Sequence, residues 1–326
     1  MTKLVTIYGG SGFVGRYIAR RLAAEGWRVR VAVRRPNEAI FVKPYGVPGQ
    51  VEPVLCNIRD DASVRAALKG ADAVVNCVGT FDARGKNNFN AVQAEGAGRI
   101  ARIAAEEGVA TMVHMSAIGA DAESASVYAQ TKAAGEAAVL AAMPNAMILR
   151  PSVIFGAEDE FFNRFAAMTI VSPIIPIAGG AARFQPVHVD DVAQAAVMGV
   201  KGEAQGVYEL GGPDVDTFAG LMKRMLGVIQ RRRLVLNMPF PVAGLVAKLS
   251  DLANRITLGL APMPITPDQV ASLKSDNVVS EGAKGFSDLE IAPVAMGAVL
   301  PGYLWRFRPS GQYADIKKSA KNLRAH

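Results

Sequence analysis

Glycines near the amino terminus have the spacing of a phosphate-binding loop. The run Gly9-Gly10-Ser11-Gly12-Phe13-Val14-Gly15 lies between the apolar segment Leu4–Tyr8 and a helical pattern. Gly9 permits a tight turn, Gly12 lets the backbone approach a pyrophosphate, and Gly15 lets the helix pack closely on the strand. The N–H groups that open the helix then face the phosphates. The pattern predicts a dinucleotide site, as opposed to a turn without a ligand, whose contacts are Gly9, Ser11, Gly12, Phe13, Val14 and Gly15.

Cations follow the second predicted strand, Val29–Val33, where many dinucleotide-binding chains carry an acid. NAD-binding domains place a carboxylate about twenty residues after the glycine loop, where it binds the ribose hydroxyls. In this chain Arg34 and Arg35 occupy that region. A guanidinium group fits a phosphate dianion better than a ribose diol, so the pair favours NADP(H) over NAD(H). The alternative is a solvated arginine pair at the end of a strand.

Short apolar runs alternate with helical patterns along the first half of the chain, which is typical of βαβ units and a parallel sheet. Strands are predicted at Leu4–Tyr8, Val29–Val33, Val51–Cys56, Ala73–Val78, Met112–Met115, Met147–Arg150 and Val207–Leu210. Helices are predicted at Phe13–Glu25, Ser63–Lys69, Val92–Glu107, Ala129–Met143, Asp190–Val200 and Thr217–Gln230. We therefore expect an α/β fold, with a Rossmann-like doubly wound parallel sheet over residues 1–215. A smaller, mostly helical region with a basic tail is expected over residues 216–326.

The composition fits a folded protein in reducing surroundings. Hydrophobic residues make up 50% of the 326 residues and charged residues 20%, which argues against disorder. Two cysteines, Cys56 and Cys77, provide neither a disulfide framework nor a metal-binding spacing, so we expect no metal site. The first strand begins too early for a targeting peptide, and no uninterrupted apolar run reaches about eighteen residues. We expect the chain on the cytoplasmic side of a bacterial membrane.

Four further motifs occur in a fixed order. They are Asn57-Ile58, Asn76-Cys77-Val78-Gly79, Tyr128-Ala129-Gln130-Thr131-Lys132, and Arg150-Pro151-Ser152-Val153-Ile154-Phe155-Gly156. In this order, and over about the first 215 residues, the chain resembles the extended and atypical short-chain dehydrogenases/reductases. The resemblance implies that Asn57 and Ile58 contact adenine, and that Val78 and Gly79 lie along the cofactor. It also implies that the loop containing Pro151 and Ile154 closes on the nicotinamide.

The YxxxK motif carries the chemistry that this resemblance implies. Tyr128 and Lys132 share one helix face, so the lysine can stabilise a tyrosinate and hold the nicotinamide ribose while Tyr128 acts as general acid or base. A Ser or Thr normally polarises the substrate oxygen, but here Ala117 occupies that position and Ser116 comes one residue early. One residue turns a side chain to the opposite face of a strand. The catalytic set is therefore predicted to be incomplete, with Tyr128, Lys132 and Ser116 holding the cofactor, unless an irregular strand end brings Ser116 to the substrate.

A narrower resemblance rests on the glycine loop, Arg34-Arg35, Val113-His114-Met115-Ser116, Arg150–Asp159 and Tyr208-Glu209-Leu210-Gly211-Gly212-Pro213. In these segments the chain resembles the nucleotide-binding accessory subunits of respiratory complex I, mitochondrial and α-proteobacterial. The resemblance implies a tightly held NADPH without turnover and a peripheral place on the cytoplasmic side of the inner membrane. It also implies contact with other complex I subunits near the junction of the peripheral and membrane arms. The alternative is an NADP-dependent oxidoreductase or epimerase that acts on an unknown small substrate.

The last third of the chain combines apolar segments with cations. Arg231-Arg232-Arg233 precedes the apolar segment Phe240–Leu249, and further apolar stretches are Ile256–Pro264 and Ala292–Leu304. Between Tyr303 and His326 there are six basic residues and one acid. Such a pattern suits a membrane surface or a hydrophobic partner, although the same helices could cap the core around a substrate pocket. The basic residues are not interleaved with aromatic ones as in nucleic-acid-binding modules, so we expect no nucleic-acid partner.

Overall fold

The computed structural model describes residues 2–80, 85–247 and 267–313, in which the chain forms two compact units. The first contains residues 1–152, 189–211 and 279–293, and the second contains residues 153–188, 212–278 and 294–326. The domain boundary at residue 215, predicted with returning segments, stays a prediction; the chain crosses repeatedly between the two units. The predicted apolar stretch 256–264 and most of the basic tail lie outside the described residues.

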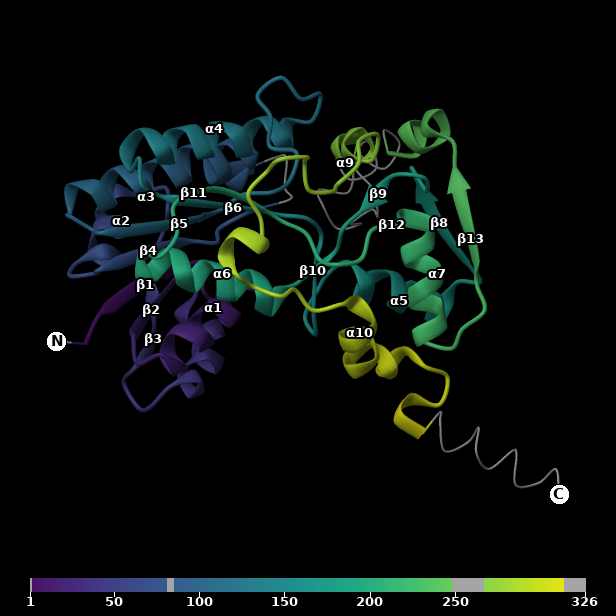
Figure 1. The fold of residues 1–326 in the computed structure, drawn as a ribbon, viewed down its shortest axis with the longest axis horizontal. Helices are drawn as coiled ribbons and strands as arrows, with labels where there is room; N and C mark the ends of the chain where they lie inside the picture. Colours follow the sequence, from purple (N-terminus) through teal and green to yellow (C-terminus); the bar gives the residue numbers. More distant parts are fainter. Residues whose placement is uncertain (1, 81–84, 248–266, 314–326) are drawn as a thin grey trace. The chain divides into compact units, whose positions relative to one another are not determined.

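A seven-stranded parallel sheet forms the centre of the first unit (Figure 1). Its strand order is β3-β2-β1-β4-β5-β6-β11. The strands are β1 (Leu4–Tyr8), β2 (Arg28–Val33), β3 (Val51–Leu55), β4 (Ala73–Asn76), β5 (Thr111–Met115), β6 (Met147–Pro151) and β11 (Gly206–Leu210). The predicted fold class is confirmed, and each predicted strand is present with ends that differ by a few residues. Cys56 and Cys77, predicted inside strands, instead follow β3 and β4.

Helices cover both faces of this sheet, which explains why its strands are apolar almost throughout. They are α1 (Phe13–Ala24), α2 (Asp61–Leu68), α3 (Glu95–Glu106), α4 (Val127–Ala142) and α6 (Val189–Lys201). Helices α1 and α6 pack together on one face, and α2, α3 and α4 lie in series on the other (Figure 1). Shorter helical segments are η1 (Pro36–Tyr45), η2 (Gly85–Asn87), the π-helical η3 (Asn90–Ala94) and η4 (Ser287–Leu289).

Side chains at the helix ends explain several of the boundaries. Ser126 caps α4 by accepting a hydrogen bond from the backbone N–H of Ala129. Two acids, Asp190 and Asp191, lie in the first turn of α6, where the helix dipole favours negative charge. Arg21 of α1 donates to both oxygens of Asp190, at 2.8 and 2.7 Å. This bidentate pair joins α1 to the start of α6.

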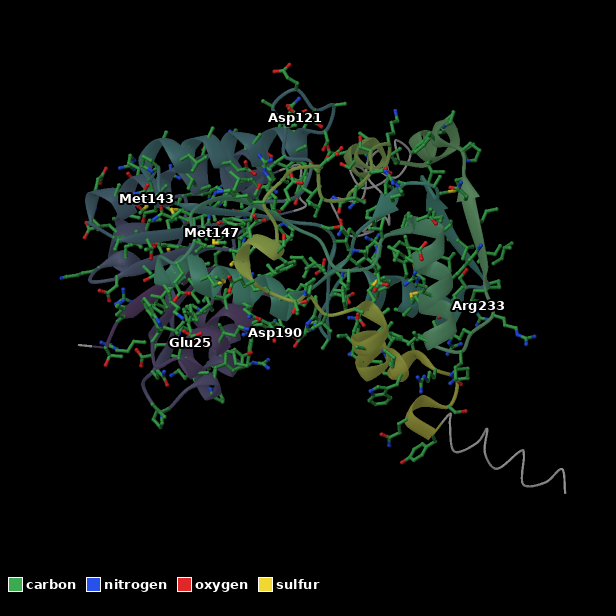
Figure 2. The ribbon with its side chains drawn as sticks, in the orientation of Figure 1. Glu25, Asp121, Met143, Met147, Asp190 and Arg233 are labelled. Atoms are coloured by element: carbon green, nitrogen blue, oxygen red, sulfur yellow. The ribbon has the colours of Figure 1, made fainter. Side chains whose placement is uncertain are left out.

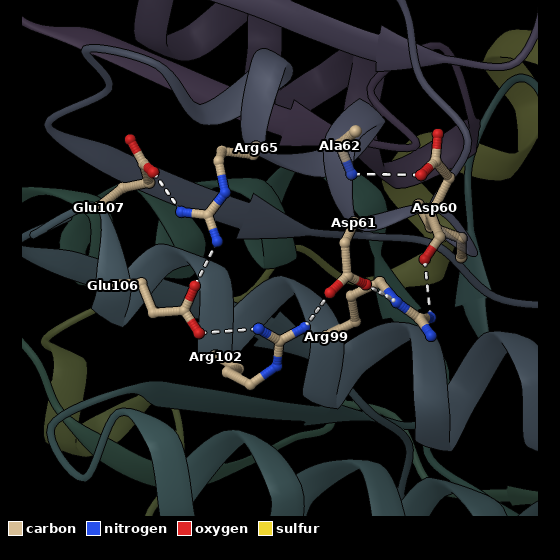
Figure 3. A network of polar contacts seen from close by, with 9 residues as sticks. Asp60, Asp61, Ala62, Arg65, Arg99, Arg102, Glu106 and Glu107 are labelled. Atoms are coloured by element: carbon tan, nitrogen blue, oxygen red, sulfur yellow. Dashed lines mark hydrogen bonds and ion pairs between the residues drawn. The ribbon is translucent and has the colours of Figure 1, made fainter.

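An exposed ion-pair network connects α2 to α3 (Figure 3). Asp61 accepts from Arg99 and Arg102, at 2.6 and 2.5 Å, and Arg102 also pairs with Glu106 at 2.7 Å. Arg65 pairs with Glu106 and with a neighbouring glutamate. Because these groups are exposed to solvent, each pair contributes little to stability.

The second unit has short strand pairs and helices around an aromatic core. Its strands pair as β7 (Ile154–Phe155) with β10 (Val187–His188), β9 (Arg183–Phe184) with β12 (Asp216–Thr217), and β8 (Ile174–Ala178) with β13 (Leu234–Met238). Its helical segments are α5 (Phe162–Val171), α7 (Phe218–Val228), residues 240–247, α9 (Pro267–Ser272), α10 (Met296–Leu304), η5 (Trp305–Phe307) and η6 (Gly311–Tyr313). The buried Tyr303 hydroxyl of α10 donates to Asp159, at 2.5 Å, just before α5. This bond ties α10 to the start of α5.

Candidate nucleotide site

The predicted site residues of the first unit follow the carboxyl ends of its strands. Because all seven strands are parallel, these ends lie along one edge of the sheet. In open α/β sheets ligands bind at this edge, where the order of the strands reverses. Here the reversal falls between β1 and β4. Along this edge the sheet gathers Gly9–Gly15 after β1, Arg34 after β2, Asn57 after β3, Val78 after β4, Ser116 after β5 and Pro151 at the end of β6.

The backbone of the glycine loop excludes side chains at two positions. Gly9 has a φ angle of +73°, and a Cβ there would lie 3.2 Å from the backbone of Cys77. A Cβ on Gly15 would lie 2.4 Å from the carbonyl oxygen of Gly9, which is closer than real Cβ contacts allow. The loop is also bonded to β2, since the Gly9 N–H donates to the carbonyl of Ala32 at 3.0 Å. Glycine at these positions lets α1 begin against the loop.

The start of α1 is suited to an anion. Gly12 precedes the helix in an extended conformation and has no side chain with which to cap it. The first turn contains no acidic residue. The N–H groups of a first helical turn have no partner within the helix, and they carry the positive end of its dipole. The loop and helix start therefore fit the phosphates of a dinucleotide.

The two arginines after β2 have different surroundings. Both side chains are exposed, and Arg35 pairs with Glu38 of η1 at 3.0 Å. Glu38 was not recognised from the sequence, although its spacing of three residues from Arg35 is typical of neighbours on a helix. The pair places a carboxylate beside one of the two cations predicted to contact a phosphate.

Tyr128 and Lys132 lie on the same side of α4, as their spacing predicts. The Lys132 ammonium is buried, donates to the carbonyl of Met115 at 3.0 Å, and lies 5.9 Å from the centre of the Tyr128 ring. Burial lowers the pKa of Lys132 to about 8, against the opposing effect of Glu136. The Tyr128 ring packs edge-on against Phe89, with centres 5.8 Å apart. The lysine is thus positioned beside the tyrosine.

Ser116 belongs to a buried ionic network. Its hydroxyl donates to the carboxylate of Glu136, which also accepts from Arg150 at 2.9 and 2.6 Å. Arg150 lies 3.6 Å from Glu209, and Glu209 accepts from the backbone N–H of Ser280 at 2.8 Å. The Ser116 hydroxyl is therefore occupied by a charged partner. Ala117, the next residue, has no hydroxyl to offer.

Glu136 was missed in the sequence, although a signal was present. It follows Lys132 by four residues and so lies on the same side of α4. Glu136 is 5% exposed, which is rare for a carboxylate unless it is paired.

Asn76 and His114 fix the loop after β4. They are directly opposite each other on β4 and β5, with the Asn76 amide nitrogen 3.2 Å from Nδ1 of His114. The Asn76 side-chain oxygen accepts from the backbone N–H of Val78 at 3.1 Å, which orients the amide. Nδ1 is consequently an acceptor, and the imidazole proton lies on Nε2. Burial lowers the pKa of His114 to about 3, so the ring is neutral at neutral pH.

The remaining predicted contact residues differ in their burial and in the unit to which they belong. Asn57 is exposed and its side chain accepts from the backbone N–H of Arg59 at 3.2 Å. Ile58 is half-buried and packs on the α2–α3 side of the core. Pro151 is buried at the end of β6. Ile154 lies in β7, a strand of the second unit, and is not among the residues that the first unit brings together.

Two observations concern the described part of the chain as a whole. None of its helices is both long enough and apolar enough to span a bilayer. Within the same residues, no group of three or more His, Cys, Asp or Glu side chains is arranged to hold a metal ion.

Known proteins are similar to this chain in sequence or in fold. The chain is 33% identical to a mitochondrial protein of Arabidopsis thaliana, NADH dehydrogenase [ubiquinone] 1 alpha subcomplex subunit 9, over 94% of this chain and 79% of the relative. It is also 33% identical to the ceramide reductase of Caulobacter vibrioides, over 77% of this chain and 80% of that enzyme. The structure of MoeE5 in complex with UDP-glucose and NAD has the same fold, with a TM-score of 0.68 at 16% identity over 92% of this chain and 97% of MoeE5.

The family resemblance inferred from the motifs is thereby confirmed at its broader level. The match to the family covers residues 5–211, which includes the glycine loop, the YxxxK motif and all seven strands of the sheet. The chain belongs to the NAD dependent epimerase/dehydratase family.

Proposed function

We propose that this chain is an accessory subunit of respiratory complex I that holds NADP(H) at the carboxyl edge of its sheet without turning it over. The observation that carries the proposal is that no hydroxyl group directly after β5 is left to polarise a substrate. Ser116 is bound to a buried carboxylate, and Ala117 has no hydroxyl. The similarity to the mitochondrial subunit of Arabidopsis thaliana, over most of both chains, supports the assignment to complex I.

The residues of the site suit a retained dinucleotide. The N–H groups at the start of α1 would hold the pyrophosphate, and Asn57 and Ile58 would flank the adenine. Lys132 would donate to the nicotinamide ribose, because its ammonium is buried beside Tyr128. When bound, NADPH would supply a hydride that can be transferred. Without a hydroxyl to polarise a substrate carbonyl, Tyr128 and Lys132 serve binding.

An exposed apolar surface on the second unit supports the proposal of a peripheral location. On the outer face of the β8–β13 pair, Leu234 is 61% exposed and lies opposite Ile174, which is 38% exposed. The neighbouring Val171 is 87% exposed, and Arg233 emerges beside β13 (Figure 2). Apolar side chains bordered by arginines suit the interface of an anionic bilayer.

Native purification tests the proposal. After gentle detergent extraction, the protein should migrate with a large NADH-oxidising assembly, and mass spectrometry of that material should find NADP(H). A Tyr128→Phe variant should keep both the nucleotide and the assembly, because neither needs the phenol as an acid. Recovery of the wild-type chain only as a free species would refute the accessory role.

A second candidate is an NADP-dependent reductase, favoured by the similarity to the ceramide reductase and by the adjacent Tyr128 and Lys132. Under this alternative, purified protein oxidises NADPH when given a ceramide-class lipid with a reducible carbonyl, and Tyr128→Phe abolishes the reaction. The two candidates thus differ in turnover: the accessory subunit has none, and the enzyme loses its own in Tyr128→Phe. Turnover that depends on Tyr128 would establish the enzyme.

A further inference from the structure

A third guanidinium group, from α1, lies at the glycine loop. Arg16 Nε lies 3.2 Å from the carbonyl oxygen of Gly12, and Arg16 Nη2 donates to that of Ser11 at 3.0 Å. Helical side chains point back towards the helix amino terminus, so a residue one turn into α1 reaches the loop. Arg16 thus brings a permanent positive charge to the edge of the candidate phosphate site.

The Arg16 side chain is also fixed from the other side. Its guanidinium carbon lies 4.8 Å from the centre of the Phe41 ring, a cation–π contact. Phe41 belongs to η1, the segment that directly follows Arg35. Arg16 therefore lies between the glycine loop and η1. Arg20 makes a similar contact one turn later, 5.4 Å from the Tyr45 ring, which holds η1 against α1.

Arg35 is less suited to a phosphate than its position in the sequence suggests. It is 75% exposed and pairs with Glu38, which is itself 67% exposed, at 3.0 Å. A carboxylate so close offsets the charge of Arg35 and repels a second anion. Arg16 lies at the glycine loop itself, beside two of its carbonyl groups and an aromatic ring.

The topology places a 2′-phosphate near Arg16. A dinucleotide on this fold has its pyrophosphate at the start of α1 and its adenosine ribose at the end of β2. The bond between the Gly9 N–H and the Ala32 carbonyl shows that the loop and the end of β2 are direct neighbours. A phosphate on the ribose 2′ oxygen therefore lies between the loop, the β2 end and η1. Arg16 and Arg34 flank this region.

We propose that Arg16 and Arg34, in preference to Arg35, form the cationic pair that recognises the 2′-phosphate of NADP(H). This inference rests on the proposed nucleotide site and names its specificity residues. Its distinguishing consequence is that neutralising Arg16 changes the preference between two dinucleotides that differ only in the 2′-phosphate.

The test is a comparison of NADPH and NADH affinities by titration calorimetry on the full chain. Arg16→Gln and Arg34→Gln should each weaken NADPH binding about tenfold or more and leave NADH binding within about twofold. Each variant loses a charge-assisted hydrogen bond to the 2′-phosphate, which NADH does not have. Arg35→Gln should lose less NADPH affinity than either. Arg20→Gln is the matched control, since it removes a similar cation–π contact of α1 one turn away from the loop. Unchanged NADH affinity also shows that each variant is folded.

Four results would overturn the inference. Equal weakening of both dinucleotides by Arg16→Gln would mean that Arg16 only shapes the loop. A loss with Arg35→Gln as large as that with Arg16→Gln would restore Arg35 to the site. A wild-type chain that binds NADH but shows no preference for NADPH would refute this inference and leave a nucleotide site in place, whereas binding of neither dinucleotide would refute the proposed function as well.

Discussion

The two ends of the candidate site differ in what their polar groups are bonded to. At the β1–β2 end, the first turn of α1 has no side-chain cap, and the arginines after β2 are exposed. At the β5–α4 end, the Ser116 hydroxyl, the Glu136 carboxylate and the Arg150 guanidinium are bonded to one another. The first end keeps donors for a ligand, whereas the serine, carboxylate and guanidinium groups of the second end are bonded among themselves. Under the proposed function, this difference is what lets the chain hold a nucleotide at one end while the polar groups of the other end are bonded within the core.

Breaking the internal network should have the largest effect. Glu136→Ala removes the bidentate partner of the half-buried Arg150, leaves the buried Ser116 hydroxyl without its acceptor, and should lower the free energy of unfolding by about 3–5 kcal/mol. Chemical denaturation measures this loss. Glu136→Gln is the matched control, because it keeps an acceptor for Ser116 and should cost less. If Glu136→Ala were as stable as the wild type, the β5–α4 end would not be an integral part of the core.

The buried Lys132 should make stability depend on pH. Its pKa of about 8 in the folded chain is below the usual value of 10.5, so between these values the unfolded chain binds more protons. Between pH 8 and 10, the free energy of unfolding relative to that of Lys132→Met should therefore rise with pH by roughly 1.4 kcal/mol per unit. Lowering the pH through the same range should reverse this gain. Denaturation of both proteins across this range isolates the effect. A flat difference would place the ammonium in solvent.

A methyl group at Gly15 should damage the β1–β2 end. Gly15→Ala places a Cβ 2.4 Å from the Gly9 carbonyl oxygen and should cost about 1–3 kcal/mol together with loss of bound nucleotide. Gly227→Ala in α7 is the control, since a Cβ there meets nothing within 4 Å. Thermal unfolding and nucleotide release measure the two effects. Retention of nucleotide by Gly15→Ala would show that the loop can move away from α1.

The smallest effect is expected away from both ends, on the surface network of α2 and α3 (Figure 3). Asp61→Asn removes the shared partner of Arg99 and Arg102. Because the network is exposed, the loss of stability should be slight and should disappear in high salt, where exposed ion pairs are screened. Melting temperatures at low and high salt provide the measurement. If the loss of stability persisted in high salt, it could not come from exposed ion pairs of Asp61, because salt screens these.

Local signals were sufficient to predict the sheet and the glycine loop. The strands of the first unit are short, apolar and separated by helical patterns, so each could be recognised without its neighbours. Gly9 and Gly15 are required by contacts within a few residues of chain, apart from the approach of Cys77.

Contacts between distant segments could not be predicted in the same way. The bond from Ser116 to Glu136 joins residues twenty positions apart, and Arg16 meets Phe41 only because η1 folds back onto α1. The spacing of Lys132 and Glu136 showed a shared helix face but not what that face would contact. The incomplete catalytic set was predicted from Ala117, while the partner that holds Ser116 became visible only in three dimensions.

The repeated crossing of the chain between its two units has a consequence for synthesis. Strand β11 of the first unit is bonded to residues 280 and 284, since Ser280 and Lys284 bond with Glu209. The second unit takes Tyr303 from near the end of the described chain as the partner of Asp159. Domains usually fold as units while the chain is still being made. The first unit therefore lacks residues 280 and 284, and the second lacks Tyr303, until that part of the chain has left the ribosome, so the two must be completed at nearly the same time.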